Sequence, residues 1–113
     1  MADHPACGLL LDTYHLQRSG RGGRGFAEVA SEEIAYVQYS DVPCEGLQPG
    51  NTLDRLPPGQ GCISFADVFG LLAEKGYSGP MCYEAPNPAA WMRDPVEVAR
   101  EALAATRAVL ATA

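Results

Sequence analysis

The sequence lacks any apolar run near the roughly 20 residues that a membrane-spanning helix needs. Its first residues, MADHPACG, also lack the basic start and apolar stretch of a secretory signal. These two absences predict a cytoplasmic protein with no membrane contact.

Basic residues are few. Eight Lys and Arg against 14 Asp and Glu give a net charge of −6, which disfavours the broad basic surface of a nucleic-acid-binding protein. The exception is the tract RSGRGGRG, which contains Arg18, Arg21 and Arg24. One such tract without interleaved aromatics is more typical of a flexible loop than of an RNA-binding segment, and salt-dependent RNA affinity would separate the two. No nucleic-acid partner is expected.

Cysteine patterns typical of metal sites are absent as well. The four cysteines, Cys7, Cys44, Cys62 and Cys82, contain no C-x-x-C pair, and three lie in or beside apolar segments. A structural zinc site and a disulfide scaffold are therefore poorly supported. The pattern predicts buried, reduced thiols.

What is present is enough apolar sequence for a core, since 47% of the 113 residues are hydrophobic. Three apolar segments with strand character and two with helical spacing follow one another along a chain of single-domain length. The strands are expected at 8–12, 34–41 and 80–84, and the helices at 64–76, capped by Ser64 and Gly76, and from Asp94 onward. A loop of about twenty residues, rich in Pro and Gly, precedes the first helix. The alternation predicts an α/β fold with parallel strands.

All three predicted strands carry an oxygen-bearing side chain at or near the carboxyl end: Asp12, Gln38 and Glu84. Singly, each has an ordinary explanation as a turn cap, a strand hydrogen-bonding residue or a solvated loop residue. Ligand sites of parallel α/β sheets and barrels, however, lie at the carboxyl ends of the strands. Two carboxylates and an amide suit a hard cation such as Mg²⁺ or Mn²⁺ better than zinc. Together the three residues predict a divalent-cation site.

Three segments carry a family resemblance: LLLDTYHL, IAYVQYSDVP and RLPPGQGCISFADVFGLLAEKGYSGPMCYEAP. They resemble the last three βα units of the xylose isomerase-like TIM-barrel family, over nearly the whole chain. That family contains sugar and sugar-phosphate isomerases and epimerases and a 3-dehydroshikimate dehydratase branch. The resemblance implies that residues 1–113 form the C-terminal part of a (β/α)₈ barrel, about three of its eight units. An upstream segment or a second copy would have to complete it.

The resemblance also implies roles for individual residues. Asp12 matches a metal-ligand aspartate, and His15 matches a histidine that contacts substrate oxygens. Glu84 matches the last-strand glutamate, a metal ligand and, in epimerases, an acid/base group. Arg55 resembles a substrate-binding arginine. Gln38 stands where many members have a metal-ligand histidine, and this departure resembles the dehydratase branch and some unassigned members.

The function implied is that of a Mn²⁺- or Mg²⁺-dependent sugar (phosphate) isomerase or epimerase, with Zn²⁺ or Co²⁺ less favoured. It would remove a proton next to the carbonyl of a small polyhydroxylated substrate. Two alternatives stay open: a 3-dehydroshikimate dehydratase-like lyase, and a non-catalytic half-barrel that associates with a partner. The family's fourth metal ligand, a glutamate from an earlier strand, has no counterpart here.

Overall fold

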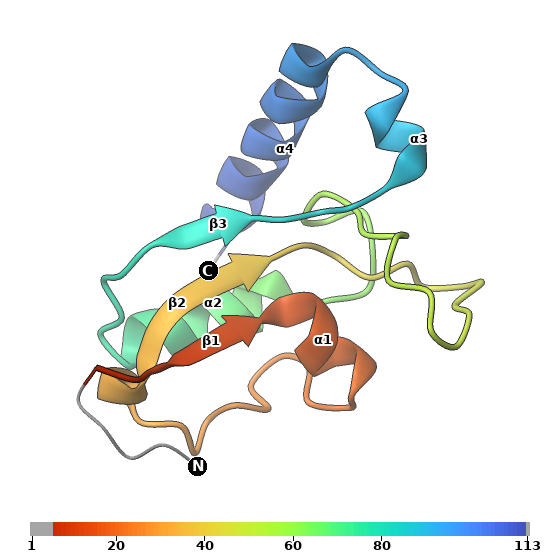
Figure 1. Ribbon diagram of the computed structural model, residues 1–113. Helices are drawn as coiled ribbons and strands as arrows, with labels where there is room; N and C mark the ends of the chain where they lie inside the picture. Colours follow the sequence, from red (N-terminus) through yellow and green to blue (C-terminus); the bar gives the residue numbers. More distant parts are fainter. Residues whose placement is uncertain (1–5, 113) are drawn as a thin grey trace.

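The computed structural model describes residues 6–112 and shows a three-stranded parallel sheet in the order β1-β2-β3 (Figure 1). The elements along the chain are β1 (Leu9–Asp12), α1 (Thr13–Arg18), a 3₁₀ turn (Ser31–Glu33), β2 (Ile34–Tyr39), α2 (Phe65–Glu74), β3 (Met81–Tyr83), α3 (Pro88–Trp91) and α4 (Pro95–Leu110). The predicted parallel α/β architecture is confirmed.

The apolar core lies between one face of the sheet and the helices α2 and α4. Tyr39 at the end of β2 makes an edge contact with Phe69 of α2 at 5.9 Å between ring centroids. Its hydroxyl lies 2.9 Å from Thr106 Oγ1 of α4. Because side chains alternate along a strand, Gln38 points to the opposite face, which is open: Leu10 on β1 is 54% exposed. The sheet is thus covered by helices on one side only.

Local signals placed α4 correctly and α2 with one exception. Asp94 accepts a hydrogen bond from the Val96 amide and Pro95 opens α4, as predicted. Gly76 adopts φ +73° just beyond the end of α2. Ser64, the predicted cap of α2, makes no capping bond through its side chain.

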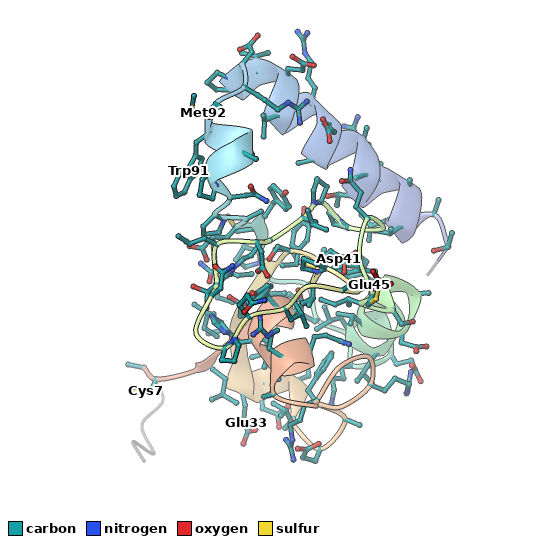
Figure 2. The ribbon with its side chains drawn as sticks, turned by 90° about the vertical axis from the view of Figure 1, so that its right-hand side faces the viewer. Cys7, Glu33, Asp41, Glu45, Trp91 and Met92 are labelled. Carbon is teal, nitrogen blue, oxygen red and sulfur yellow. A yellow bond between two sulfur atoms is a disulfide. The ribbon has the colours of Figure 1, made fainter. Side chains whose placement is uncertain are left out.

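Two short helices, α1 and α3, were not predicted. Helix α1 has only 6 residues and follows β1 without a loop, because the strand's last residue is also the helix cap. Helix α3 has 4 residues, too few for a periodic pattern. Trp91 at its end and the adjacent Met92 project from the surface, 65% and 88% exposed (Figure 2).

The prediction of buried, reduced cysteines is wrong. Cys44 and Cys62 form a disulfide with their Cα atoms 5.1 Å apart, and Cys7 and Cys82 are free and exposed. The pairing arises because the long loop after β2 returns to its start: the Cys62 amide donates to the Val42 carbonyl at 2.8 Å. This long-range contact has no local sequence signal.

Between residues 6 and 112, no helix has the length and apolarity needed to span a membrane.

The tyrosines make the stability sensitive to alkaline pH. Burial raises the pKa of Tyr83, which packs 5.7 Å from the Tyr39 ring, to about 12. A raised folded-state pKa gives stability that is present in full below pH 10 and is lost as the pH rises toward 12. We expect the free energy of unfolding, measured by urea titration, to fall between pH 10 and 12. The decrease should be shallower in Tyr83→Phe, and an equal decrease in both proteins would contradict this assignment.

Candidate functional site

Asp12 connects the first strand to the first helix. It is the last residue of β1 and the cap of α1, where its Oδ1 accepts hydrogen bonds from the amides of Tyr14 at 2.9 Å and His15 at 3.3 Å. A carboxylate is a favourable helix cap because it satisfies free amides at the positive end of the helix dipole. This role uses one oxygen and leaves Oδ2 directed away from the helix.

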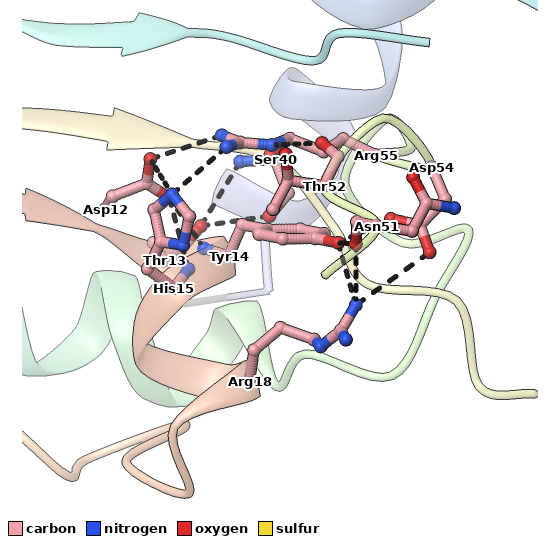
Figure 3. Close-up of polar contacts among 10 residues, drawn as sticks. All are labelled: Asp12, Thr13, Tyr14, His15, Arg18, Ser40, Asn51, Thr52, Asp54 and Arg55. Carbon is pink, nitrogen blue, oxygen red and sulfur yellow. Dashed lines mark hydrogen bonds and ion pairs between the residues drawn. The ribbon is translucent and has the colours of Figure 1, made fainter. Parts of the chain in front are cut away.

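Arg55, from the long loop, contacts that second oxygen (Figure 3). Its Nη1 donates to Asp12 Oδ2 at 3.2 Å, and its Nη2 lies 3.1 Å from His15 Nε2. Because a guanidinium has only donors, His15 accepts this bond through Nε2. The Asp12 and Arg55 side chains are 11% and 8% exposed, whereas His15 is 57% exposed. The structure therefore brings Asp12, His15 and Arg55 together, with the imidazole at the open edge.

Tyr14 supports the guanidinium of Arg55 from beneath. The Tyr14 side chain is fully buried, and the Arg55 guanidinium carbon lies 4.4 Å from its ring centroid, in the range of a cation–π contact. Its hydroxyl donates to Asp54 Oδ1 at 2.5 Å and accepts from Arg18 at 2.9 Å. Burial, followed by the hydrogen bond to Asp54, raises the pKa of Tyr14. No local sequence pattern indicated this contact network, because Tyr14 and Asp54 lie 40 positions apart.

Ser40 lies at the end of β2 in the same cluster. Its amide and carbonyl both bond to Thr13 Oγ1, at 3.2 and 2.9 Å. Its own hydroxyl is buried and has no hydrogen-bond partner among residues 6–112. The start of α1 and the segment that follows β2 are therefore joined side by side.

Asp41, the residue after Ser40, organises the long loop and was also missed as a site-forming residue. It is fully buried, and its carboxylate accepts four backbone hydrogen bonds, from Val42 and Ile63 on Oδ1 and from Gly59 and Gly61 on Oδ2, at 2.8–2.9 Å. Position 61 requires glycine because the main chain at Val42 passes close to it: a Cβ there would lie 2.1 Å from the Val42 carbonyl oxygen. The available sequence signal was an acidic residue directly after an apolar strand, followed by P-G-x-G.

Asp41 also sets the position of Arg55 through the backbone. The Asp41 amide donates to the Leu56 carbonyl at 2.7 Å, and the Leu56 amide donates back at 3.1 Å. The neighbouring Arg55 carbonyl accepts from the Asn87 side chain at 3.1 Å. The main chain at Arg55 is thus held by the hydrogen bond to its own carbonyl and by the Asp41–Leu56 pair beside it.

Gln38 and Glu84 lie on the open face of the sheet. Gln38 pairs in register with Asp12 on one side and with Cys82 on the other. The Glu84 amide bonds to the Tyr39 carbonyl at 3.1 Å, so Glu84 extends the sheet one residue beyond β3. Strand alternation then directs Asp12, Gln38 and Glu84 to the same face. In residues 6–112 there is no group of three His, Cys, Asp or Glu that could hold a metal ion.

The arginine-rich tract does not form a free basic surface. Arg21 pairs with Glu28, and Arg24 pairs with Glu74 of α2. Arg18 is directed into the Tyr14 network instead. Beyond Arg18, which ends α1, the tract forms a loop whose two arginines are paired with carboxylates. The expectation that the chain binds no nucleic acid stays a prediction.

Comparison with known proteins identifies the family. A family model described as xylose isomerase-like TIM barrel matches residues 1–109. The chain belongs to this family. The open sheet face is the interior side of a xylose isomerase-like barrel, where strands contribute side chains to the lumen and the active site lies at their carboxyl ends. Asp12, His15 and Arg55 lie at that end.

Several individual proteins are similar to the chain. A 3-dehydroshikimate dehydratase from Pseudomonas aeruginosa is 32% identical over 88 residues, which are 76% of this chain and 14% of that protein. An inosose dehydratase from Clostridium beijerinckii is 28% identical, over 90% of this chain and 38% of that protein. Among solved structures, the IolI protein crystallised with a zinc atom superposes with a TM-score of 0.84 at 23% identity, covering 95% of this chain and 38% of that one.

Each of these matches covers most of this chain but less than half of the similar protein. The chain spans 14% to 38% of the length of these relatives, and its three parallel strands compare with the eight of a complete barrel. The xylose isomerase-like fold is therefore present as a C-terminal-type part of the barrel.

Proposed function

We propose that this chain contributes part of a metal-dependent active site, formed at the carboxyl ends of its strands. The complete site would remove a proton next to a carbonyl group, in a dehydratase or an isomerase. The observation that carries the proposal is the contact of Asp12 with Arg55 and His15 at the carboxyl end of β1, with Gln38 in register beside it. A carboxylate, an amide and a guanidinium at the carboxyl ends of neighbouring strands suit a reaction in which negative charge develops on substrate oxygens.

The donors present fit a hard divalent cation. Asp12, Gln38 and Glu84 supply oxygen ligands on one sheet face, which favours Mn²⁺ or Mg²⁺ over a soft-ligand zinc site. These three residues would hold the ion, and the remaining ligand would come from outside residues 6–112. When bound, the cation supplies Lewis-acid stabilisation of the negative charge that develops on the carbonyl oxygen.

The remaining roles belong to the chain's own side chains. Glu84, exposed just beyond β3, would exchange a proton with the carbon next to the carbonyl. His15, at the open edge, and Arg55, beneath it, would hold substrate oxygens by hydrogen bonds. Tyr14 keeps the Arg55 guanidinium in place by stacking against it. The substrate that suits these groups is a small polyhydroxylated carbonyl compound.

Dehydration is the favoured outcome of the proton transfer. Two of the similar proteins are named as dehydratases. In addition, a glutamine at position 38, where many family members have histidine, resembles the dehydratase branch. In this reaction the proton leaves the carbon next to the carbonyl, and a hydroxyl on the neighbouring carbon departs as water. Isomerisation shares the first step and differs only in where the proton returns.

The proposal also requires a complete barrel. Either a further segment of the same polypeptide or a second copy of the chain would supply further strands, and only the further segment could supply the glutamate that this sequence lacks. Native mass spectrometry of the protein from its own source separates the two, since the chain alone has a mass of 12.0 kDa. A monomer of that mass with no turnover would favour the non-catalytic half-barrel instead.

The activity test uses the protein as its source makes it, with 3-dehydroshikimate and an inosose as substrates. We expect product formation to stop after treatment with a chelator and to return with Mn²⁺ or Mg²⁺, with weaker recovery by Zn²⁺. Product analysis in D₂O distinguishes water loss from deuterium exchange with isomerisation. Turnover that survives complete metal removal would contradict the proposal.

A further inference from the structure

The Cys44–Cys62 disulfide lies at the surface, at the two ends of the long loop that carries Arg55. Both cysteines are exposed, and they lie 18 positions apart in the sequence. An exposed disulfide can be reached by a thiol reductant, and accessible bonds are typical of labile rather than purely structural disulfides. Reduction of an accessible disulfide affects the protein only if the loop that it closes keeps other residues in position.

The segment 44–53 is exposed throughout. It contacts the body of the protein through main-chain oxygens that accept hydrogen bonds from Arg18 of α1: the Gln48 carbonyl at 3.1 Å and the Asn51 carbonyl at 3.2 Å. The Asn51 carbonyl also lies 3.1 Å from the Tyr14 hydroxyl, whose single proton goes to Asp54. Two glycines with positive φ, Gly46 at +74° and Gly50 at +78°, add backbone freedom. A covalent tie at the start of such a segment limits how far it can move.

The same two side chains connect the segment to the candidate site. Tyr14 stacks against Arg55, which bonds to Asp12 and His15. Movement of the segment would remove two acceptors from Arg18, which also donates to the Tyr14 hydroxyl, and would thereby loosen the support of the Arg55 guanidinium. The disulfide is thus connected to the site through three consecutive contacts.

A surface cavity of about 240 Å³ lies against the disulfide and is lined by Cys44, Cys62, Leu47 and Arg18, among others. This cavity offers a reductant an approach to the sulfurs.

We propose that Cys44 and Cys62 form a reversible thiol–disulfide modification site, whose substrate is a dithiol reductant and whose state sets the order of the loop 43–55 and the placement of Arg55. A thiolate of the reductant attacks one sulfur, the S–S bond breaks, and the other cysteine leaves as a thiolate. The second thiol of the reductant then displaces the first cysteine. Two electrons and two protons pass to the protein, and the reductant becomes its own disulfide. The inference does not depend on the proposed reaction.

Thiol trapping tests the chemistry directly. The folded protein is incubated with graded dithiothreitol, alkylated, and mapped by mass spectrometry, with circular dichroism as a check of folding. We expect Cys44 and Cys62 to become alkylated together while the protein stays folded, and to lose reactivity again on reoxidation. Cys7 and Cys82 should react in both states and serve as internal controls. Alkylation of Cys44 and Cys62 without reductant, or their reduction only after unfolding, would overturn the proposal.

Hydrogen exchange tests the consequence for the loop. Closing a loop of this length restricts its open states on the order of 100-fold. We therefore expect exchange of the hydrogen-bonded amides in this segment, those of Asn51 and Leu53, to rise by up to about that factor in the double variant Cys44→Ser/Cys62→Ser. The peptide that contains Arg55 should lose protection as well. The matched variant Cys7→Ser should exchange like the unaltered protein. Unchanged exchange in the double variant would show that the noncovalent contacts order the loop and that the disulfide controls nothing.

Discussion

Replacing Asp41 by asparagine is expected to lower the free energy of unfolding by about 3–5 kcal/mol. The carboxylate accepts two backbone amides on each oxygen, all within 2.9 Å, in a fully buried position. An asparagine keeps one acceptor oxygen and turns an NH₂ group toward the other two amides. Those amides lose their partner and face a second donor. Urea unfolding followed by circular dichroism measures the difference.

The matched control for Asp41→Asn is Glu45→Gln, which removes a carboxylate from the exposed part of the same loop (Figure 2). Exposed substitutions of this kind usually change stability by less than about 0.5 kcal/mol. A small effect in both variants would mean that the loop does not depend on Asp41. Because the Asp41–Leu56 backbone pair lies next to Arg55, Asp41→Asn should also weaken any ligand binding that needs Arg55.

Replacing Asp12 by asparagine is expected to lower the affinity for Mn²⁺ by at least about a hundredfold. Loss of even an outer-shell partner typically costs 10–100-fold, and Asp12 is proposed to be a direct ligand. Asparagine remains a good helix cap, so α1 should persist, while Arg55 loses its buried ion partner at a cost of about 2 kcal/mol. Isothermal titration with MnCl₂, together with an unfolding curve, separates the two effects.

The control for Asp12→Asn is Asp54→Asn, which alters a carboxylate of the same polar cluster that bonds to Tyr14. Its Mn²⁺ affinity should stay within about threefold of the unaltered protein. Equal Mn²⁺ affinities of the Asp12 variant and the unaltered protein would exclude Asp12 as a ligand. Asp12→Ala provides a further comparison, because it also removes the helix cap and should cost about 1 kcal/mol more than the asparagine variant.

The elements that the sequence predicted well are those with strong local signals. The apolar segments of β1, β2 and β3 and the spacing of α2 predicted a parallel α/β fold, and Asp94-Pro95 marked the start of α4. The family resemblance implied a metal-ligand role for Asp12 and substrate-binding roles for His15 and Arg55, and the structure brings the three residues into contact. Their assignment as ligands and substrate-binding residues stays a prediction.

The residues that prediction missed depend on long-range contacts. Tyr14 meets Asp54 across 40 positions, and the Asp41 carboxylate meets Ile63 across 22. Neither pairing leaves a periodicity or a spacing that a local pattern can show. The same reason explains the cysteines: apolar neighbours suggested burial, whereas the returning loop places Cys44 and Cys62 together at the surface.

By itself the sequence determined the three strands, the two longer helices and the oxygen-bearing residues at the strand ends, because apolar periodicity and capping are properties of neighbouring residues. Only the tertiary structure decided how Arg55 is placed, since its position depends on a buried carboxylate, a stacked ring and a disulfide that the chain brings together from different elements. Burial gives these contacts their strength: a carboxylate removed from water must be fully hydrogen-bonded or paired, and in this protein that requirement fixes the loop.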